Sequence, residues 1–138
     1  MPVPVVVTGA DTPLGTAVVE VLRGDGAEVR ATVRTRAAAA QVPRPVAVMD
    51  LSDPLRFGAV LEGAHTVVHL DPAPMHWVVE AAEDTSVRRL VLIRPVGMPG
   101  PDVSAATTEG LEVVVLAGDV SRVDPVLVRS IVEADRRR

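Results

Sequence analysis

The sequence predicts an α/β protein: one domain, residues 1–138, with a doubly wound parallel sheet of about six strands. Three observations support this fold class. Short apolar runs alternate with segments of helical periodicity along the chain. The first run, Val3 to Val7, breaks at Thr8-Gly9, and a helix opens at Thr12-Pro13, a capping residue before proline. Of the residues, 48% are apolar but only 1% are aromatic, so Val, Leu and Ala must fill a sheet buried on both faces.

The first half of the chain alternates between strands and helices. The first helix covers 13–23, with Leu14 and Val18 on its apolar face, and Gly24-Asp25-Gly26 ends it. A strand at 27–33 precedes an alanine-rich segment, 34–41, that we expect to be a short helix or a loop. The third strand covers 45–50. Asp53-Pro54 caps a helix through Leu61, and Gly63 closes it.

The second half repeats the alternation. We expect strands at 65–70, 89–93 and 111–116, and helices at 75–84, 103–109 and from 125 to about Asp135, which Asp124-Pro125 caps. Proline and glycine between 95 and 101 predict a turn-rich loop after the fifth strand. The segment 103–109 has room for barely two helical turns. Right-handed crossovers then complete the sheet.

Composition excludes several classes of function. The formal net charge is −4, and no basic block precedes the arginines at 136–138, so we expect no nucleic-acid partner. The chain has no cysteine, which excludes a disulfide, a thiolate zinc site and a thiol nucleophile. We expect no metal site, no membrane contact and a cytoplasmic location, because neither a signal peptide nor a membrane span is visible.

Five stretches resemble motifs of the short-chain dehydrogenase/reductase superfamily, in its extended and atypical branch of NAD-dependent epimerases/dehydratases and NmrA-like proteins. They are TGADTPLG (8–15), EVRATVR (28–34), VMDLSDP (48–54), VVHLDPAP (67–74) and VRRLVLIRPVG (87–97). The resemblance implies a Rossmann-like sheet with the strand order 3-2-1-4-5-6 and a dinucleotide site. The implied cofactor-binding residues are Gly9, Ala10, Thr12, Leu14, Gly15, Arg34, Asp50 and Leu51.

The chain differs from the family at the positions of the family's catalytic residues. It has no tyrosine and no lysine, so the catalytic Tyr-x-x-x-Lys is absent, and Arg94-Pro95 stand where the catalytic serine is expected. We expect no C-terminal substrate domain of the kind that the family carries. Thr12 replaces the second loop glycine, and two interpretations stay open: its hydroxyl binds a phosphate, or it is simply the helix N-cap.

The end of the second strand bears on cofactor choice. The acidic residue that holds a ribose 2′-hydroxyl is replaced by Val33, whereas Arg34 and Arg36 suit a 2′-phosphate. We therefore expect NADP rather than NAD, if a dinucleotide binds. The alternative is an ordinary pair of solvated arginines.

Asp71, His76 and Arg94 form a candidate catalytic set at the carboxyl edge of the sheet. In the alternative interpretation, Asp71 forms a turn or pairs with Arg94, while His76 faces solvent beside Trp77. His65 and His69 are expected to be structural.

These observations predict an atypical Rossmann protein that binds or senses NADP without dehydrogenase catalysis. The first alternative is a cofactor-independent isomerase, dehydratase or cyclase that uses Asp71, His76 and Arg94. The second is a pseudoenzyme that associates with another protein. We expect a small-molecule ligand or dinucleotide, and a homodimer or larger assembly with Val78, Val79 and Ala82 as a contact face.

Overall fold

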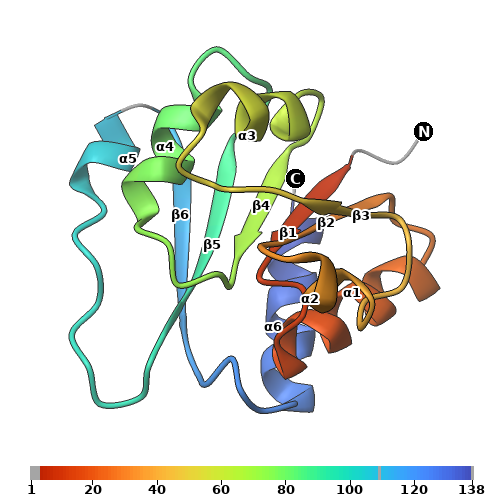
Figure 1. Ribbon diagram of the computed structural model, residues 1–138. Helices are drawn as coiled ribbons and strands as arrows, with labels where there is room; N and C mark the ends of the chain where they lie inside the picture. Colours follow the sequence, from red (N-terminus) through yellow and green to blue (C-terminus); the bar gives the residue numbers. More distant parts are fainter. Residues whose placement is uncertain (1–3, 109, 138) are drawn as a thin grey trace.

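A computed structural model of the chain describes residues 4–108 and 110–137, and it shows six parallel strands in the order β3-β2-β1-β4-β5-β6 (Figure 1). The strands are β1 (Val5–Thr8), β2 (Val29–Val33), β3 (Val46–Val48), β4 (Thr66–His69), β5 (Arg89–Arg94) and β6 (Glu112–Ala117). The predicted fold class and strand order are confirmed. Three residues of predicted segments lie outside the described residues: residue 3 of the first strand, residue 109 of the fifth helix and residue 138 of the C-terminal arginines.

The helices are α1 (Pro13–Gly24), α2 (Arg36–Ala39), α3 (Pro54–Leu61), α4 (Met75–Ala82), α5 (Ser104–Thr108) and α6 (Pro125–Arg136). Three of them begin at the predicted cap-proline pairs. Thr12 accepts a hydrogen bond from the Gly15 N–H, and Asp53 and Asp124 each accept two from the first turns of α3 and α6. In the part of the chain that the structure describes, no helix is long and apolar enough to cross a membrane.

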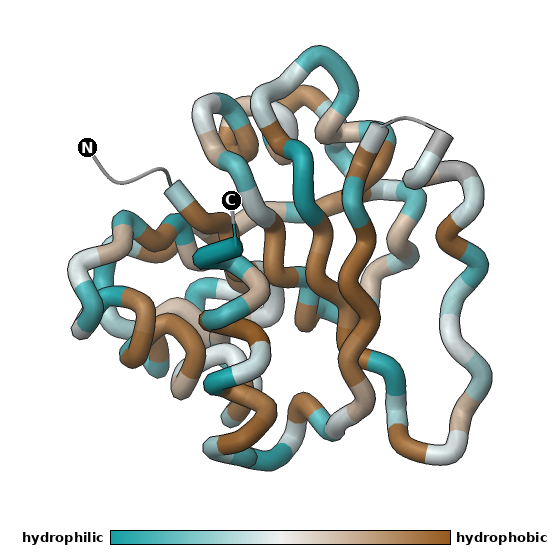
Figure 2. Tube along the Cα trace, turned by 180° about the vertical axis from the view of Figure 1, so that it is seen from behind, coloured by the Kyte–Doolittle hydropathy of each residue, from teal (hydrophilic) through white to brown (hydrophobic). Residues whose placement is uncertain are grey.

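The pleat of β1 divides the apolar core into two layers. Val5 and Val7 pack in one layer with residues of α1 and α6, whereas Val6 belongs to the other with residues of α3 and α4. The first layer includes Leu14, Leu22 and Ile131, and the second includes Phe57, Leu61 and Val78. Figure 2 shows the strands in the centre of the view as largely apolar segments. The sheet is buried on both faces, which requires helices on both sides.

The predicted contact face on α4 is wrong for two of its three residues. Val78 is fully buried and Ala82 is 7% exposed, and both pack inside the second core layer. The reason is that α4 packs directly beside α3 over the sheet, so this face of α4 covers the chain's own strands. Val79 is half-buried. Self-association of the chain stays a prediction.

Two glycines hold the turn between β1 and α1 against its neighbours. Gly9 has φ +62°, and a Cβ built there would lie 2.6 Å from the Asp71 nitrogen. A Cβ at Gly15 would lie 2.4 Å from the Gly9 carbonyl oxygen. Both contacts are to backbone atoms, which no side-chain rotation can relieve. The turn can therefore lie against the end of β4 only with glycine at position 9, and it can fold onto the start of α1 only with glycine at position 15.

We predict that Gly9→Ala lowers the free energy of unfolding by about 3 kcal/mol or more, since it combines a left-handed non-glycine residue with a backbone clash. Gly26→Ala is the matched control, because Gly26 has φ +87° but no atom within 4 Å of a built Cβ. The control should lose only about 1–2 kcal/mol. Urea unfolding followed by circular dichroism measures both; equal losses would show that the contact with Asp71 costs nothing.

Candidate functional site

The turns that follow β1, β4, β5 and β6 gather at the carboxyl edge of the sheet (Figure 1). A groove with a cavity volume of about 1110 Å³ lies there, between the turn after β4 and the loops after β5 and β6. Its walls are mainly apolar, with Leu92, Ile93 and Val96 on the side of β5. Asp71 and Arg94 of the predicted catalytic set line this groove. Ligands of doubly wound sheets bind at this edge, so we take it as the candidate site.

The hydroxyl of Thr8 joins the ends of β1 and β4. Its oxygen lies 2.7 Å from Nδ1 of His69 and accepts hydrogen bonds from the backbone N–H groups of Leu70 and Asp71 at 3.1 and 3.3 Å. Nε2 of His69 lies 2.7 Å from the Ala73 carbonyl oxygen. Because a carbonyl only accepts, Nε2 carries the proton and Nδ1 accepts from the Thr8 hydroxyl. Both ring nitrogens of His69 are thus engaged, which agrees with its expected structural role.

Arg34 and Asp71 form a bidentate ion pair across the end of β1. Arg34 Nε donates to Asp71 Oδ2 at 2.9 Å, and Nη2 donates to Oδ1 at 2.5 Å. Asp71 Oδ1 also accepts from the Ala73 N–H at 2.8 Å. The Asp71 side chain is 4% exposed and the Arg34 side chain 53% exposed. Asp71 raises the pKa of Arg34 through its hydrogen bonds and its charge. Sequence reasoning selected both residues but did not pair them.

The predicted catalytic set does not assemble, and Arg94 is not the partner of Asp71. Arg94 lines the groove and donates from Nη1 to the Met98 carbonyl at 3.1 Å. His76 is exposed on the first turn of α4 and is not among the residues that line the groove; its ring lies edge-on to that of Trp77, with centroids 6.2 Å apart. The Asp71 carboxylate turns instead toward β2, where Arg34 supplies two donors. The turn at 72–74 leaves His76 toward solvent.

The first turn of α1 has no free backbone donor. Pro13 lacks an N–H, the Leu14 N–H donates to the Val120 carbonyl at 3.0 Å, and the Gly15 N–H donates to Thr12 Oγ1 at 3.0 Å. The Thr12 hydroxyl itself donates to the Gly9 carbonyl at 2.8 Å. Of the two interpretations of Thr12, the structure therefore shows the N-cap. No sequence signal marks Val120, because it lies in the irregular loop 118–124.

A smaller hollow of about 300 Å³ lies at the ends of β2 and β3. It is lined by Arg34, Met49, Asp50, Leu51 and Trp77, which include three of the predicted cofactor-binding residues. Asp50 accepts hydrogen bonds from the hydroxyl and N–H of Ser52, and these lower the pKa of the Asp50 carboxyl. Met49, Leu51 and Trp77 offer apolar surface, and Asp50 offers hydrogen-bond acceptors. The hollow can therefore hold a flat aromatic ring that carries hydrogen-bond donors at its edge.

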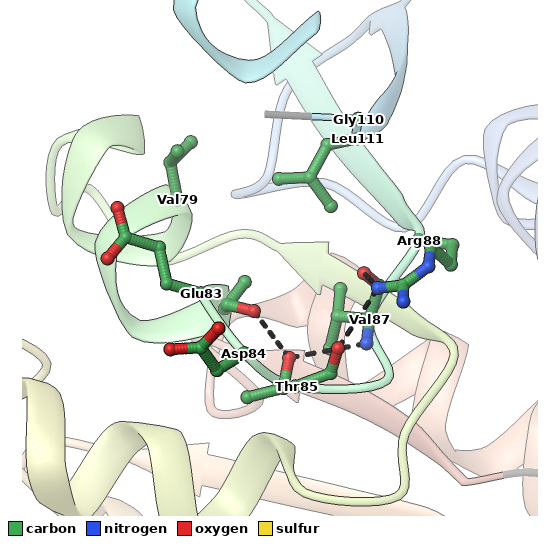
Figure 3. A pocket seen from close by; sticks show the side chains of 9 residues that line it. Val79, Glu83, Asp84, Thr85, Val87, Arg88, Gly110 and Leu111 are labelled. Atoms are coloured by element: carbon green, nitrogen blue, oxygen red, sulfur yellow. Dashed lines mark hydrogen bonds between the residues drawn. The ribbon is translucent and has the colours of Figure 1, made fainter. Parts of the chain in front are cut away.

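Another hollow lies at the opposite, amino-terminal edge of the sheet (Figure 3). It has a volume of about 520 Å³, and Glu83, Asp84 and Arg88 are among the side chains that line it. Thr85 closes the turn there by donating its hydroxyl to the Ala82 carbonyl at 2.6 Å. Within residues 4–108 and 110–137, no three His, Asp or Glu side chains gather where they could hold a metal ion. This hollow is not part of the carboxyl-edge site.

Comparison with known proteins gives matches in structure but not in sequence. No protein-family model matches the chain, and no curated protein sequence matches it. A Rossmann-fold NAD(P)-binding family protein from Shigella flexneri shares 17% identity over 85% of this chain and 67% of its own, with a TM-score of 0.67. The enzyme WbmH of Bordetella bronchiseptica, solved with NAD+, shares 14% identity over 99% and 73%, with a TM-score of 0.71.

UDP-glucose 4-epimerase from Brucella ovis, solved with NAD, shares 14% identity over 83% of this chain and 51% of its own, with a TM-score of 0.68. The chain therefore spans between 51% and 73% of the length of the WbmH and epimerase structures. At these identities the likeness concerns the fold. The structural neighbours are Rossmann-fold NAD(P)-binding proteins and NAD-dependent epimerases, which confirms the resemblance at the level of the fold.

We predict that the buried His69 makes stability fall in mild acid. Burial lowers the pKa of His69 below its usual value of 6.5, and this outweighs the raising effects of the Ala73 carbonyl and Asp71. As pH falls below 6.5, the unfolded chain takes up a proton that the folded chain does not. The free energy of unfolding should therefore drop by up to about 1.4 kcal/mol per pH unit, and should be unaffected by this group above pH 7.

Urea unfolding between pH 5 and 8 measures this dependence. His69→Gln should flatten the profile, whereas His76→Gln, which changes an exposed histidine, should leave it as in the unmodified chain. A profile that is the same in all three proteins would show that His69 does not carry the dependence.

Proposed function

We propose that this chain binds a nicotinamide dinucleotide at the carboxyl edge of its sheet, favours the 2′-phosphorylated form, and does not catalyse hydride transfer. The observation that carries the proposal is the position of Arg34, which follows β2 and lines the hollow formed by Met49, Asp50, Leu51 and Trp77. Two structural neighbours were solved with NAD, which supports a ligand of this class.

The residues around the hollow fit the adenosine end of such a ligand. Met49, Leu51 and Trp77 would enclose the adenine ring, and Asp50 would accept from its amino group. Val33 at the end of β2 is buried and apolar, so it offers no acceptor to a ribose 2′-hydroxyl. Arg34 keeps its Nη1 group without an acceptor among the described residues, and this group would bind a 2′-phosphate. Arg36, also expected to suit the phosphate, lines a separate hollow with Arg44 and Val46.

The chain lacks the groups that hydride transfer in this fold family would need. A bound nicotinamide ring can carry a hydride, but reduction of a carbonyl also needs a proton donor beside the reacting atoms. The sequence has no tyrosine or lysine. His69 donates its proton to the Ala73 carbonyl, and His76 lies outside the groove. The residues of this edge would bind and orient a ligand rather than move protons, which suits a binding or sensing protein.

We predict that Arg34→Ala abolishes the preference for NADP over NAD. Charge-assisted hydrogen bonds are worth about 1.5–3 kcal/mol, so affinity for NADP should fall about tenfold or more while affinity for NAD changes little. Isothermal titration calorimetry with both ligands measures this. Arg129→Ala, which removes an equal charge from an exposed position on α6, is the control. Equal affinity of the unmodified chain for NAD and NADP would contradict the proposed preference.

We predict the opposite effect for Asp71→Asn. Asp71 already occupies Nε and Nη2 of Arg34, so a phosphate on the remaining Nη1 would bind against the negative charge of this carboxylate. Asparagine keeps the acceptor for the Ala73 N–H but removes the charge. A half-exposed ion pair is worth about 0.2–1 kcal/mol, so NADP should bind up to about fivefold more tightly to the variant. The same calorimetric titration tests this; weaker binding would mean that Asp71 supports the ligand.

A further inference from the structure

The Arg34–Asp71 ion pair separates the two hollows of the carboxyl edge. Arg34 lines the smaller hollow at β2 and β3, and Asp71 lines the groove at β4 to β6; among the described residues, none lines both. The pair joins the residue after β2 to the turn after β4, so it passes over the end of β1, which lies between those strands. A dinucleotide that placed adenine in the hollow and nicotinamide in the groove would have to cross this ion pair.

The position where a pyrophosphate would ordinarily bind is also filled. Helix N-termini hold phosphates through the free N–H groups of their first turn. Here the Val120 carbonyl accepts from Leu14, and the Thr12 hydroxyl accepts from Gly15. A phosphate oxygen at this helix end would have to displace the Val120 carbonyl and leave it without its donor.

The loop 118–124 makes several contacts with the rest of the chain. The Gly118 N–H donates to the Arg94 carbonyl at 2.8 Å, and a Cβ built at Gly118 would lie 2.3 Å from Leu127 Cδ2. Asp119 Oδ1 accepts from the N–H and hydroxyl of Ser121 at 2.9 and 2.6 Å. These contacts flank Val120 on both sides and orient its carbonyl toward α1.

We infer that this site recognises only the 2′-phosphoadenosine end of its ligand and does not bind the pyrophosphate on α1 or the nicotinamide in the groove. This inference rests on the proposed function, and it adds a ligand class: any 2′-phosphoadenosine compound, with or without a nicotinamide. A consequence is that oxidised and reduced NADP bind equally, because the ring that differs between them makes no contact with the chain.

Calorimetric titration with adenosine 2′,5′-bisphosphate, NADP and NADPH tests the inference. We expect three dissociation constants that agree within about threefold. Binding of NADP that is more than tenfold tighter than binding of the bisphosphate would overturn the inference and leave the proposed function standing. A tenfold difference between NADP and NADPH would have the same meaning. If none of the three compounds binds, both the inference and the proposed function are wrong.

A loop variant tests the role of Val120 separately. Asp119→Ala removes the acceptor that holds Ser121, so it should loosen the Val120 carbonyl and let a pyrophosphate reach the Leu14 N–H. In the double variant Asp71→Asn/Asp119→Ala, we expect the affinity for NADP to exceed the affinity for the bisphosphate by at least about fivefold. In the unmodified chain the two affinities should stay alike. Asp102→Ala combined with Asp71→Asn is the matched control, since Asp102 accepts from Ser104 in the same arrangement elsewhere. An equal gain in the control pair, or no gain in either, would overturn the role given to Val120.

Discussion

The close approach of the turn after β1 to the turn after β4 is the contact on which the carboxyl edge depends. Gly9 lies against the backbone of Leu70 and Asp71, with no space for a Cβ, and the Thr8 hydroxyl accepts from both of those N–H groups. His69 completes the junction by binding Thr8 through one ring nitrogen and the Ala73 carbonyl through the other. Buried polar groups of this kind are stable because each has a partner.

That junction decides where the charges of the edge lie. With its backbone held beside Gly9, Asp71 sits next to the end of β1 and within reach of Arg34 from β2. The charges of Asp50 and Asp11 also raise the pKa of Arg34, in addition to the hydrogen bonds and charge of Asp71. In the proposed function, a phosphate on Nη1 of Arg34 would bind against the negative charge of these carboxylates, and Arg34 would determine the charge of the ligand.

The same edge has the strand order and turns of a Rossmann fold. Arg94 ends β5, and the Met98 carbonyl holds it rather than a carboxylate. The groove beside Arg94 is mainly apolar. A scaffold of this kind can recognise a ligand by charge and shape without the aligned proton donor that catalysis needs.

The sequence by itself determined the features that depend on residues close together along the chain. Thr12, Asp53 and Asp124 cap helices because a side-chain acceptor and the N–H groups it binds lie within three positions of each other. The alternation of strands and helices likewise predicts that the strands of the sheet run parallel. Only the tertiary structure decided which partners the site residues have. Arg34 and Asp71 are separated by 37 positions, and Val120 reaches Leu14 through a loop without periodicity. Such pairings depend on where loops pass and how side chains turn at the sheet edge, and no local pattern of residues encodes either.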